Sequence, residues 1–404
     1  MLKIAQWGAM PFSSHELNES GTNLKQVVDG AGQNIGNLAI GTYVNKQFSN
    51  TEYIGFAANA DVVNKKYDML LIAAANFINP SFDLGRWADF LEKINIPVVC
   101  IGIGAQAPAF SSYFKVSAGT ERFIKILSEK TDIIGTRGYY TAEILNSWGI
   151  KNVEPIGCPT SYSSCKNMYK KPELGDIKNV SLTGSNYQPD VLKKSLQTLS
   201  DVEYKYFAQD EYVWMEHFKN KTIQGGVFKA QLDGAEYGSA RAMPIYYCST
   251  IAEWGVEAAE CDFAFGTRMH GNMVAFKNGV PTVWVHVDSR TQELCEYLGL
   301  PGVSKAKFLT DGSLDMLANV YEASNFEEKY VQNYAKYHDF LCARGLGNNI
   351  KLEAPAVEFK QDASKIRKME QTIRFNQYWV ESLHQRSEWL GNRVTNLEKE
   401  AVSE

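Results

Sequence analysis

One stretch of this chain, residues 261–290, restricts the fold more than any other part of the sequence. Residues 263–265 are an apolar run that ends at a glycine, and residues 270–277 follow with the spacing of a helix. An Asn-Gly pair at 278–279 ends that helix, and a proline soon after it bars its continuation before the β-branched run 282–287. Strand, helix and strand in this order predict a βαβ unit with parallel strands and a right-handed crossover.

The chemistry of this stretch lies at the turn between its first strand and its helix, where Arg268 and His270 flank a methionine. The start of a helix presents unpaired backbone N–H groups and about half a positive charge, which suits an anion. A guanidinium and a titratable imidazole at that end predict a site for a small phosphate or carboxylate. Arg290 leaves the next strand and can point into the same crevice.

Strands alternate with helices along the first 165 residues. Five apolar runs predict strands at 2–7, 68–74, 96–101, 132–135 and 153–156. Such alternation is typical of an open, mostly parallel α/β sheet, in which ligands bind beyond the carboxyl ends of the strands. We expect four loops at that edge, at 33–37, 76–80, 102–106 and 136–138.

Candidate ligand-binding residues lie in three of these loops: Asn34 and Gly36, then Gln106, then Arg137. The glycine-rich loop at 30–37 does not have the spacing of the dinucleotide fingerprint, so a plain turn and a ligand-facing loop both stay open. For Arg137 the alternative is an ion pair with a helix carboxylate. Gln106 and Asn34 can equally have structural roles.

A polar stretch at 163–178 predicts a linker between two domains. We expect a first Rossmann-like domain at 1–165 and a second at 175–325, which contains the Arg268 and His270 turn. Within the second domain, residues 302–307 are interpreted as a connection. Residues 326–404 are predicted to be a helical extension, in which 364–380 and 382–400 are amphipathic. Packing onto the body, a pairing surface for a homo-oligomer and peripheral contact with a membrane are the alternatives for these two helices.

Composition excludes several classes of protein. The net charge of −5 over 404 residues argues against nucleic acid as the main partner. The N-terminal residues do not have the pattern of a signal peptide, and no apolar run reaches about 18 residues. The seven cysteines include no CxxC pair, which indicates reduced thiols in the cytoplasm. We expect no metal site, with zinc or a disulfide at Cys158 and Cys165 as a minor alternative.

The turn and its surroundings resemble the polysaccharide pyruvyl transferase family. The matching residues are Gly266-Thr267-Arg268-Met269-His270-Gly271, Ala275, Gly279-Val280-Pro281, Asp288, Arg290 and Glu293-Leu294. Supporting matches are Asn34-x-Gly36, Gly102-x-Gly104-x-Gln106, Arg137-Gly138 and Gly157-Cys158-Pro159-Thr160. The chain departs from the family at Asn37, where the first loop usually has Asp, and at Cys158-Pro159-Thr160, where Asp-Pro-Ala is usual. The resemblance spans roughly residues 30–300.

The resemblance implies two Rossmann-like domains in the arrangement of GT-B glycosyltransferases, with the acceptor on the first and the donor on the second. It implies phosphoenolpyruvate as the donor and a pyruvate ketal on a sugar of a surface polysaccharide, or of its lipid-linked precursor, as the product. No other cofactor is implied. It also implies a cytoplasmic enzyme that works at the inner face of the membrane.

Phosphoenolpyruvate carries two adjacent anionic groups, so the reaction needs matched positive charge and a proton donor. We expect Arg268 to grip an anion and His270 to act as general acid/base or as phosphate binder. Arg290 is expected to be a second clamp or an interdomain residue, with a surface ion pair as its alternative. Asp288 is expected to orient His270 or bind an acceptor hydroxyl. Gly271 completes the predicted binding residues.

Two rival functions remain on the sequence evidence. The first is a GT-B glycosyltransferase that uses a nucleotide sugar, although we find no clear signature for a base and ribose. The second is a protein without enzymatic activity that binds a sugar or lipid carrier in a polysaccharide assembly complex. Binding alone would not need an acid/base residue at a phosphate-type turn, so Arg268 together with His270 disfavours this second reading.

Overall fold

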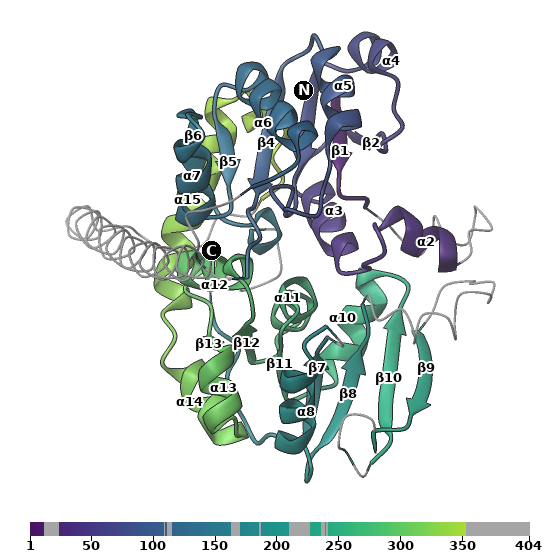
Figure 1. The fold of residues 1–404 in the computed structure, drawn as a ribbon, viewed down its shortest axis with the longest axis vertical. Helices are drawn as coiled ribbons and strands as arrows, with labels where there is room; N and C mark the ends of the chain where they lie inside the picture. Colours follow the sequence, from purple (N-terminus) through teal and green to yellow (C-terminus); the bar gives the residue numbers. More distant parts are fainter. Residues whose placement is uncertain are drawn as a thin grey trace, which may run out of the picture.

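Two sheets, one from each half of the chain, form the framework of the protein (Figure 1). The computed structural model describes residues 1–11, 24–108, 110, 115–162, 170–185, 187–209, 227–235, 239 and 241–352. The amphipathic helices predicted at 364–380 and 382–400 lie outside these residues, as does Cys165.

The first sheet has six parallel strands in the order β2-β1-β3-β4-β5-β6. Its strands are β1 (Ile4–Gly8), β2 (Thr51–Tyr53), β3 (Met69–Ala73), β4 (Val98–Ile103), β5 (Ile134–Thr136) and β6 (Val153–Pro155). The helices are α2 (Leu24–Gly30), α3 (Asn37–Asn45), α4 (Ala60–Lys66), α5 (Gly85–Glu92), α6 (Ala118–Lys130), α7 (Tyr139–Ser147) and the 3-10 turn η1 (Pro159–Ser161). Every residue of β3 is buried, because helices cover both faces of a parallel sheet, and its sequence is therefore uninterrupted apolar.

The second sheet has seven strands in the order β13-β12-β11-β7-β8-β10-β9, all parallel except β9. Its strands are β7 (Asn179–Thr183), β8 (Glu203–Phe207), β9 (Val227–Leu232), β10 (Met243–Cys248), β11 (Phe263–Gly266), β12 (Thr282–His286) and β13 (Gly302–Ser304). The helices are α8 (Pro189–Thr198), α10 (Ile251–Ala259), α11 (Met269–Lys277), α12 (Ser289–Leu298), α13 (Lys305–Asp311) and α14 (Leu314–Glu322). The interpretation of 302–307 as a connection was wrong, since β13 and the start of α13 occupy it.

The predicted βαβ unit is present as β11, α11 and β12. Its two strands pair in parallel, with Ala264 opposite Thr282 and Phe265 opposite Val283. The loops that follow β3, β4 and β5 of the first sheet meet the loops that follow β11 and β12 of the second. The predicted fold class, two Rossmann-like domains in a GT-B-type arrangement, is therefore confirmed.

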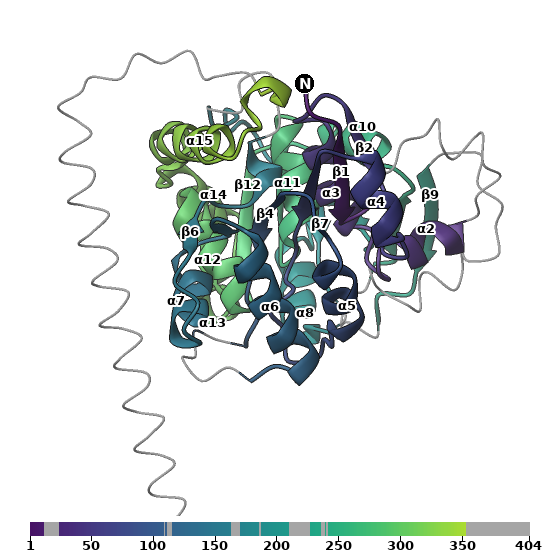
Figure 2. The same cartoon turned by 90° about the horizontal axis from the view of Figure 1, so that it is seen from above.

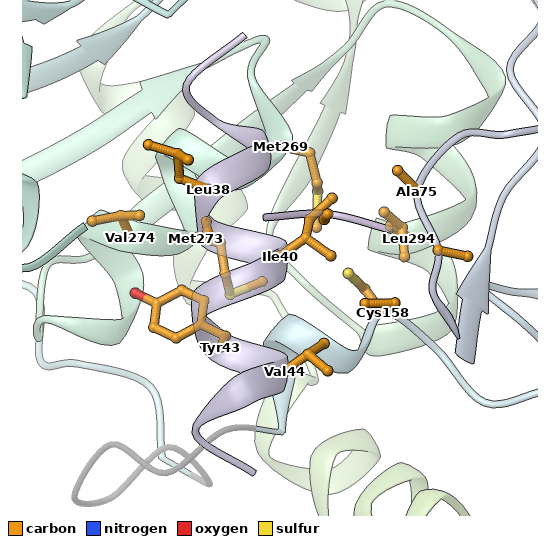
Figure 3. Close-up of a cluster of buried hydrophobic side chains, with 14 of the residues drawn as sticks. Leu38, Ile40, Tyr43, Val44, Ala75, Cys158, Met269, Met273, Val274 and Leu294 are labelled. Carbon is orange, nitrogen blue, oxygen red and sulfur yellow. The ribbon is translucent and has the colours of Figure 1, made fainter. Parts of the chain in front are cut away.

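We call the contact region between the two domains the seam; it joins α3, the loop 104–107 and residues 137–141, which include the first turn of α7, to α11 and α12. Figure 3 shows its apolar part, where side chains of α3 such as Ile40 and Tyr43 face Met269, Met273 and Val274 of α11. All nine residues of α11 are buried. A helix that is covered on every side lies between layers, and α11 has the second sheet on one side and α3 on the other.

The chain returns to the first domain through α15 (Phe326–Ala343) and the 3-10 turn η3 (Gly347–Asn349). The Tyr337 hydroxyl donates to Gln47 Oε1 (2.8 Å), and Asn349 Nδ2 donates to the carbonyl oxygens of Leu2 (2.8 Å) and Ser49 (2.9 Å). In both overall views α15 lies on the flank opposite α2 and β9 (Figures 1 and 2). This return holds the two domains together outside the seam.

Candidate functional site

The turn between β11 and α11 has a backbone shape that only glycine adopts easily. Gly266 has φ +152°, and a Cβ there would lie 2.3 Å from the carbonyl oxygen of Thr183. That oxygen accepts the backbone N–H groups of Thr267 (2.9 Å) and Arg268 (3.3 Å). Asn272, which is fully buried, donates from Nδ2 to the Gly266 carbonyl (3.0 Å) and so fixes the turn from the helix side.

Arg268 is half-buried at this turn and is directed toward the loop after β7. Its Nε donates to the Gly184 carbonyl (3.0 Å) and its Nη2 to the Ser185 hydroxyl (2.8 Å). Both partners belong to the second domain. The guanidinium therefore ties the start of α11 to a neighbouring loop of the same sheet.

His270 points the other way, into the seam. It is 7% exposed, and its Nε2 lies 3.9 Å from Sγ of Cys158, which follows β6 of the first domain. The Cys158 thiol also lies 3.0 Å from the Thr160 hydroxyl. The two residues that the sequence places side by side at one turn thus have partners in different domains.

Arg137 follows β5 and is fully buried. Its Nε donates to the Gly102 carbonyl (2.9 Å) and its Nη2 lies 3.5 Å from the Ala74 carbonyl. Among the described residues its Nη1 has no hydrogen-bond partner. Gly104 makes room for the side chain, since a Cβ there would lie 2.8 Å from Arg137 Cδ. The alternative of an ion pair with a helix carboxylate was wrong, because carbonyl oxygens hold this arginine.

Arg290 is also at the seam, with its side chain 17% exposed. Its Nη2 donates to Asp288 Oδ2 (3.2 Å), while its buried Nε has no partner among the described residues. Asp288 itself is the N-cap of α12 through Oδ1, which accepts the Thr291 N–H (2.8 Å). Arg290 therefore forms an ion pair, but this pair lies in the seam between the domains. The alternative of a surface ion pair, which the sequence also allowed, is not what the structure shows.

The charges of these groups act on His270. Burial lowers the pKa of its imidazole well below the usual range, and the nearby charges of Arg137 and Arg290 lower that pKa further. Burial also lowers the pKa of the Arg137 guanidinium, with Arg290 contributing. Two cations and a neutral imidazole, with two guanidinium N–H groups lacking partners among the described residues, form an arrangement that an anion stabilises.

The first glycine loop approaches the second domain at Gln209, a buried residue that belongs to no motif found in the sequence. Its backbone carbonyl accepts the Ile35 N–H (3.2 Å). A Cβ on Gly36 would lie 2.3 Å from Gln209 Oε1, and one on Gly271 would lie 2.5 Å from its Nε2. Both predicted glycines therefore permit close approach to this amide. Asn34 accepts the Gly36 N–H at its own side chain (2.8 Å), which shapes the loop.

Glu293 of α12 has a structural role that the sequence did not assign. Its two carboxylate oxygens accept the Thr141 N–H (2.7 Å) and the Thr141 hydroxyl (2.8 Å) at the first turn of α7, in the other domain. Gly138 makes room for it, since a Cβ there would lie 2.5 Å from Glu293 Cγ. Burial raises the pKa of this carboxyl group to about 7, against the bonds from Thr141 and the charge of Arg137, which lower it.

Within the described part of the chain, no group of three or more His, Cys, Asp or Glu side chains is arranged to hold a metal ion. No helix in that same part has the length and apolar character needed to cross a bilayer.

Several solved structures are similar to this chain over most of its length. They include MnaA from S. aureus with UDP (13% identity, 88% of this chain and 100% of that one, TM-score 0.42) and the wall teichoic acid polymerase TagF as an H444N variant (11%, 86% and 87%, 0.41). A third is the UDP-GlcNAc 2-epimerase from Methanocaldococcus jannaschii (9%, 83% and 99%, 0.39). No curated protein sequence matches the chain.

A comparison with protein-family models gives one match, to the polysaccharide pyruvyl transferases, over residues 34–289. This range begins at the first glycine loop, includes Arg137, the turn at 266–271 and Asp288, and ends within the first turn of α12. It thus contains both sides of the seam and more than half of the chain. The protein belongs to the polysaccharide pyruvyl transferase family.

Proposed function

We propose that this protein transfers the pyruvyl group of phosphoenolpyruvate to two hydroxyl groups of a sugar, forming a pyruvate ketal. The observation that carries the proposal is the cluster of Arg137, Arg290 and His270 at the seam. Two buried guanidinium N–H groups there lack a partner among the described residues. Phosphoenolpyruvate brings a phosphate and a carboxylate on adjacent atoms, and both groups suit such donors.

His270 supplies the proton in this proposal. With no anion bound, burial and the two arginines keep the pKa of His270 low and the ring neutral. A bound dianion adds the opposite charge and raises that pKa, so the ring gains a proton only when the donor is in place. The resulting imidazolium can protonate the methylene carbon of phosphoenolpyruvate, which becomes a methyl group.

The remaining steps balance without a further reactant. One sugar hydroxyl adds to the central carbon of the donor and gives its proton back to the imidazole. The bond from that carbon to the phosphate oxygen then breaks, and phosphate leaves. The second hydroxyl adds to the same carbon and its proton goes to phosphate. One phosphate is released for each ketal formed.

Arg268 has a supporting position in this scheme. Its guanidinium is bonded to Gly184 and Ser185. That geometry favours Arg137 and Arg290 as the arginines that bind the anion beside His270. Arg268 then holds the turn in place, so that the N-terminus of α11 is directed toward the anion. The acceptor would then approach along the first-domain loops that contain Asn34, Gly36 and Gln106. We further propose a lipid-linked sugar as acceptor and the inner face of the membrane as the place of action.

The test is acceptor-dependent release of phosphate. The purified protein is incubated with phosphoenolpyruvate and galactose- or mannose-type acceptors, and the His270→Ala and Arg268→Ala variants are measured beside it. Loss of a general acid/base typically costs about 10²–10⁴-fold in turnover. The matched control is His338→Ala on α15, which should keep wild-type turnover.

Two results would count against the proposal. Turnover of a nucleotide sugar in the absence of phosphoenolpyruvate would show a glycosyltransferase instead. Full activity of the His270→Ala variant would remove the assignment of the proton donor, even if phosphate release depends on the acceptor.

A further inference from the structure

We propose that Gln106 does not contact the substrate but positions Arg290 through Asp288, so that the anion site is completed only when the two domains are closed. The identity of the anion rests on the proposed function. The hydrogen bonds from which we infer the positioning role do not depend on it. Its basis is a chain of side-chain hydrogen bonds that runs across the seam from Asn76 and Asn79 to Arg290.

Gln106 is held in one orientation by its neighbours. Its Oε1 accepts hydrogen bonds from the side-chain amides of Asn76 and Asn79, the latter at 3.2 Å, and its Nε2 donates to Asp288 Oδ2 (3.1 Å). A carboxylate can only accept, so the end of Gln106 that faces Asp288 must be the NH₂ group. The two asparagines then complete the pattern at the other end.

The same oxygen of Asp288 links Gln106 to the arginine. Asp288 Oδ2 accepts from Gln106 Nε2 and from Arg290 Nη2 (3.2 Å), while Oδ1 caps α12. A carboxylate with all these donors is fixed in place, and it holds Arg290 by one nitrogen. The Nε of Arg290 is buried and has no partner among the described residues.

The first-domain side of this connection is rigid. The loops after β3 and β4 bond to each other, since Ile78 N–H donates to the Gly104 carbonyl (3.1 Å) and Gln106 N–H to the Ile78 carbonyl (2.9 Å). A second contact adjoins it, where the Ala107 N–H donates to the Ser289 hydroxyl (2.9 Å) and the Ser289 N–H donates to the Ala107 carbonyl (3.0 Å).

Opening of the seam would therefore remove Gln106 from Asp288, and Arg290 would lose its fixed direction. Binding of the anion and closure of the domains are thus coupled, because each favours the same state. Asn76 and Asn79, which the sequence did not single out, become positioning residues that act through Gln106 and Asp288.

The experiment breaks the hydrogen bond between Gln106 and Asp288. Gln106→Glu places a second carboxylate against Asp288, and we expect the affinity for inorganic phosphate to fall by about tenfold or more, as for loss of a hydrogen bond to a charged group. In an Arg290→Met background the same change should have at most a small further effect, because Gln106 acts on the anion only through Asp288 and Arg290. Calorimetric titration with phosphate gives the affinity without turnover.

Two further variants make the result specific. Gln197→Glu makes the same chemical change on an exposed part of α8 and should leave the affinity unchanged. Asn79→Ala removes one bond to Gln106 and should raise the KM for phosphoenolpyruvate several-fold with little change in kcat, which gives a second reading if Gln106→Glu fails to fold.

Each outcome of these experiments supports or overturns the positioning role of Gln106. Absence of a further loss in the double variant supports positioning, whereas a full additional loss in a folded double variant means that Gln106 contacts the ligand directly and overturns it. Unchanged affinity in Gln106→Glu, or no phosphate binding by the wild type, also overturns it. Phosphate binding with the expected non-additive losses but no turnover of phosphoenolpyruvate rejects the proposed reaction and leaves the positioning role standing.

Discussion

The carboxylate of Glu293 on α12 accepts two hydrogen bonds from Thr141 at the first turn of α7, so a helix of one domain caps a helix of the other. A negative charge is favourable at a helix N-terminus, yet burial raises the pKa of Glu293 to about 7. The Glu293 carboxyl group, which joins the two domains, therefore also titrates near neutral pH.

This contact predicts a pH dependence of stability. The pKa of Glu293 rises from 4.5 to about 7 on folding, so the folded state favours the neutral carboxyl group. The neutral carboxyl group therefore adds to the free energy of unfolding. This stabilisation is complete below the unfolded-state pKa of 4.5 and is lost as pH rises through the folded-state pKa of about 7. It amounts to about 3 kcal/mol at most. Calorimetric Tm measured against pH should show a steeper fall for wild type than for Glu293→Gln. Glu129→Gln, at an exposed position of α6, is the control and should keep the wild-type slope; an equal slope in Glu293→Gln would contradict the assignment.

A second prediction concerns Arg137. Arg137→Lys keeps the charge but loses the planar fork, and with it Nη1 and the paired bonds to the two carbonyl oxygens. We expect the affinity for phosphate or phosphoenolpyruvate to fall by about tenfold or more. Arg122→Lys makes the same change at an exposed pair with Asp89 and Glu92, and should bind as wild type does. Wild-type affinity in Arg137→Lys would exclude this residue from the anion site.

Packing of the seam gives a third prediction. Met273 on α11 is fully buried and faces α3 (Figure 3). Met273→Ala leaves a cavity between the domains and should lower the free energy of unfolding by about 2–5 kcal/mol, measured by urea denaturation. Val256→Ala shortens a side chain that is 67% exposed on α10 and should change it by less than about 0.5 kcal/mol. Equal effects of the two changes would show that α3 and α11 do not pack in solution.

The turn at Gly266 gives a fourth prediction. Gly266→Ala adds a Cβ at φ +152° and 2.3 Å from the Thr183 carbonyl, so the backbone must shift. Backbone strain alone costs about 1–3 kcal/mol. We expect a lower Tm together with reduced turnover, since His270 follows this turn. Gly175→Ala, where nothing lies within 4 Å of the added atom, should leave Tm and turnover near wild type. A Gly266→Ala variant with unchanged Tm would disprove the strain.

Edge strands were the hardest part of the fold to predict. Central strands such as β3 and β11 are buried on both faces, so they could be predicted directly from their apolar sequences. The edge strand β2 has the sequence TEY with partly exposed residues, and β13 is three residues long. Short edge strands carry few apolar residues because one side faces solvent or a loop, so periodicity gives no signal.

The residues of the candidate site also differed in whether their roles could be predicted from the sequence. The turn that carries Arg268 and His270 could be found because a strand, a glycine and a helix start are local features of the sequence. Gln209 and Glu293 have no local signal for their roles, since each acts on a residue far away along the chain.

By itself, the sequence determined the βαβ unit at 261–290 and the alternation of strands and helices, and it predicted an anion site at the turn, because hydrophobic period and turn chemistry are encoded within a few residues. Only the tertiary structure decided that Arg268 bonds within its own domain while His270 faces Cys158, Arg137 and Arg290. The directions of two neighbouring side chains depend on what packs against each, and those partners come from the other end of the chain.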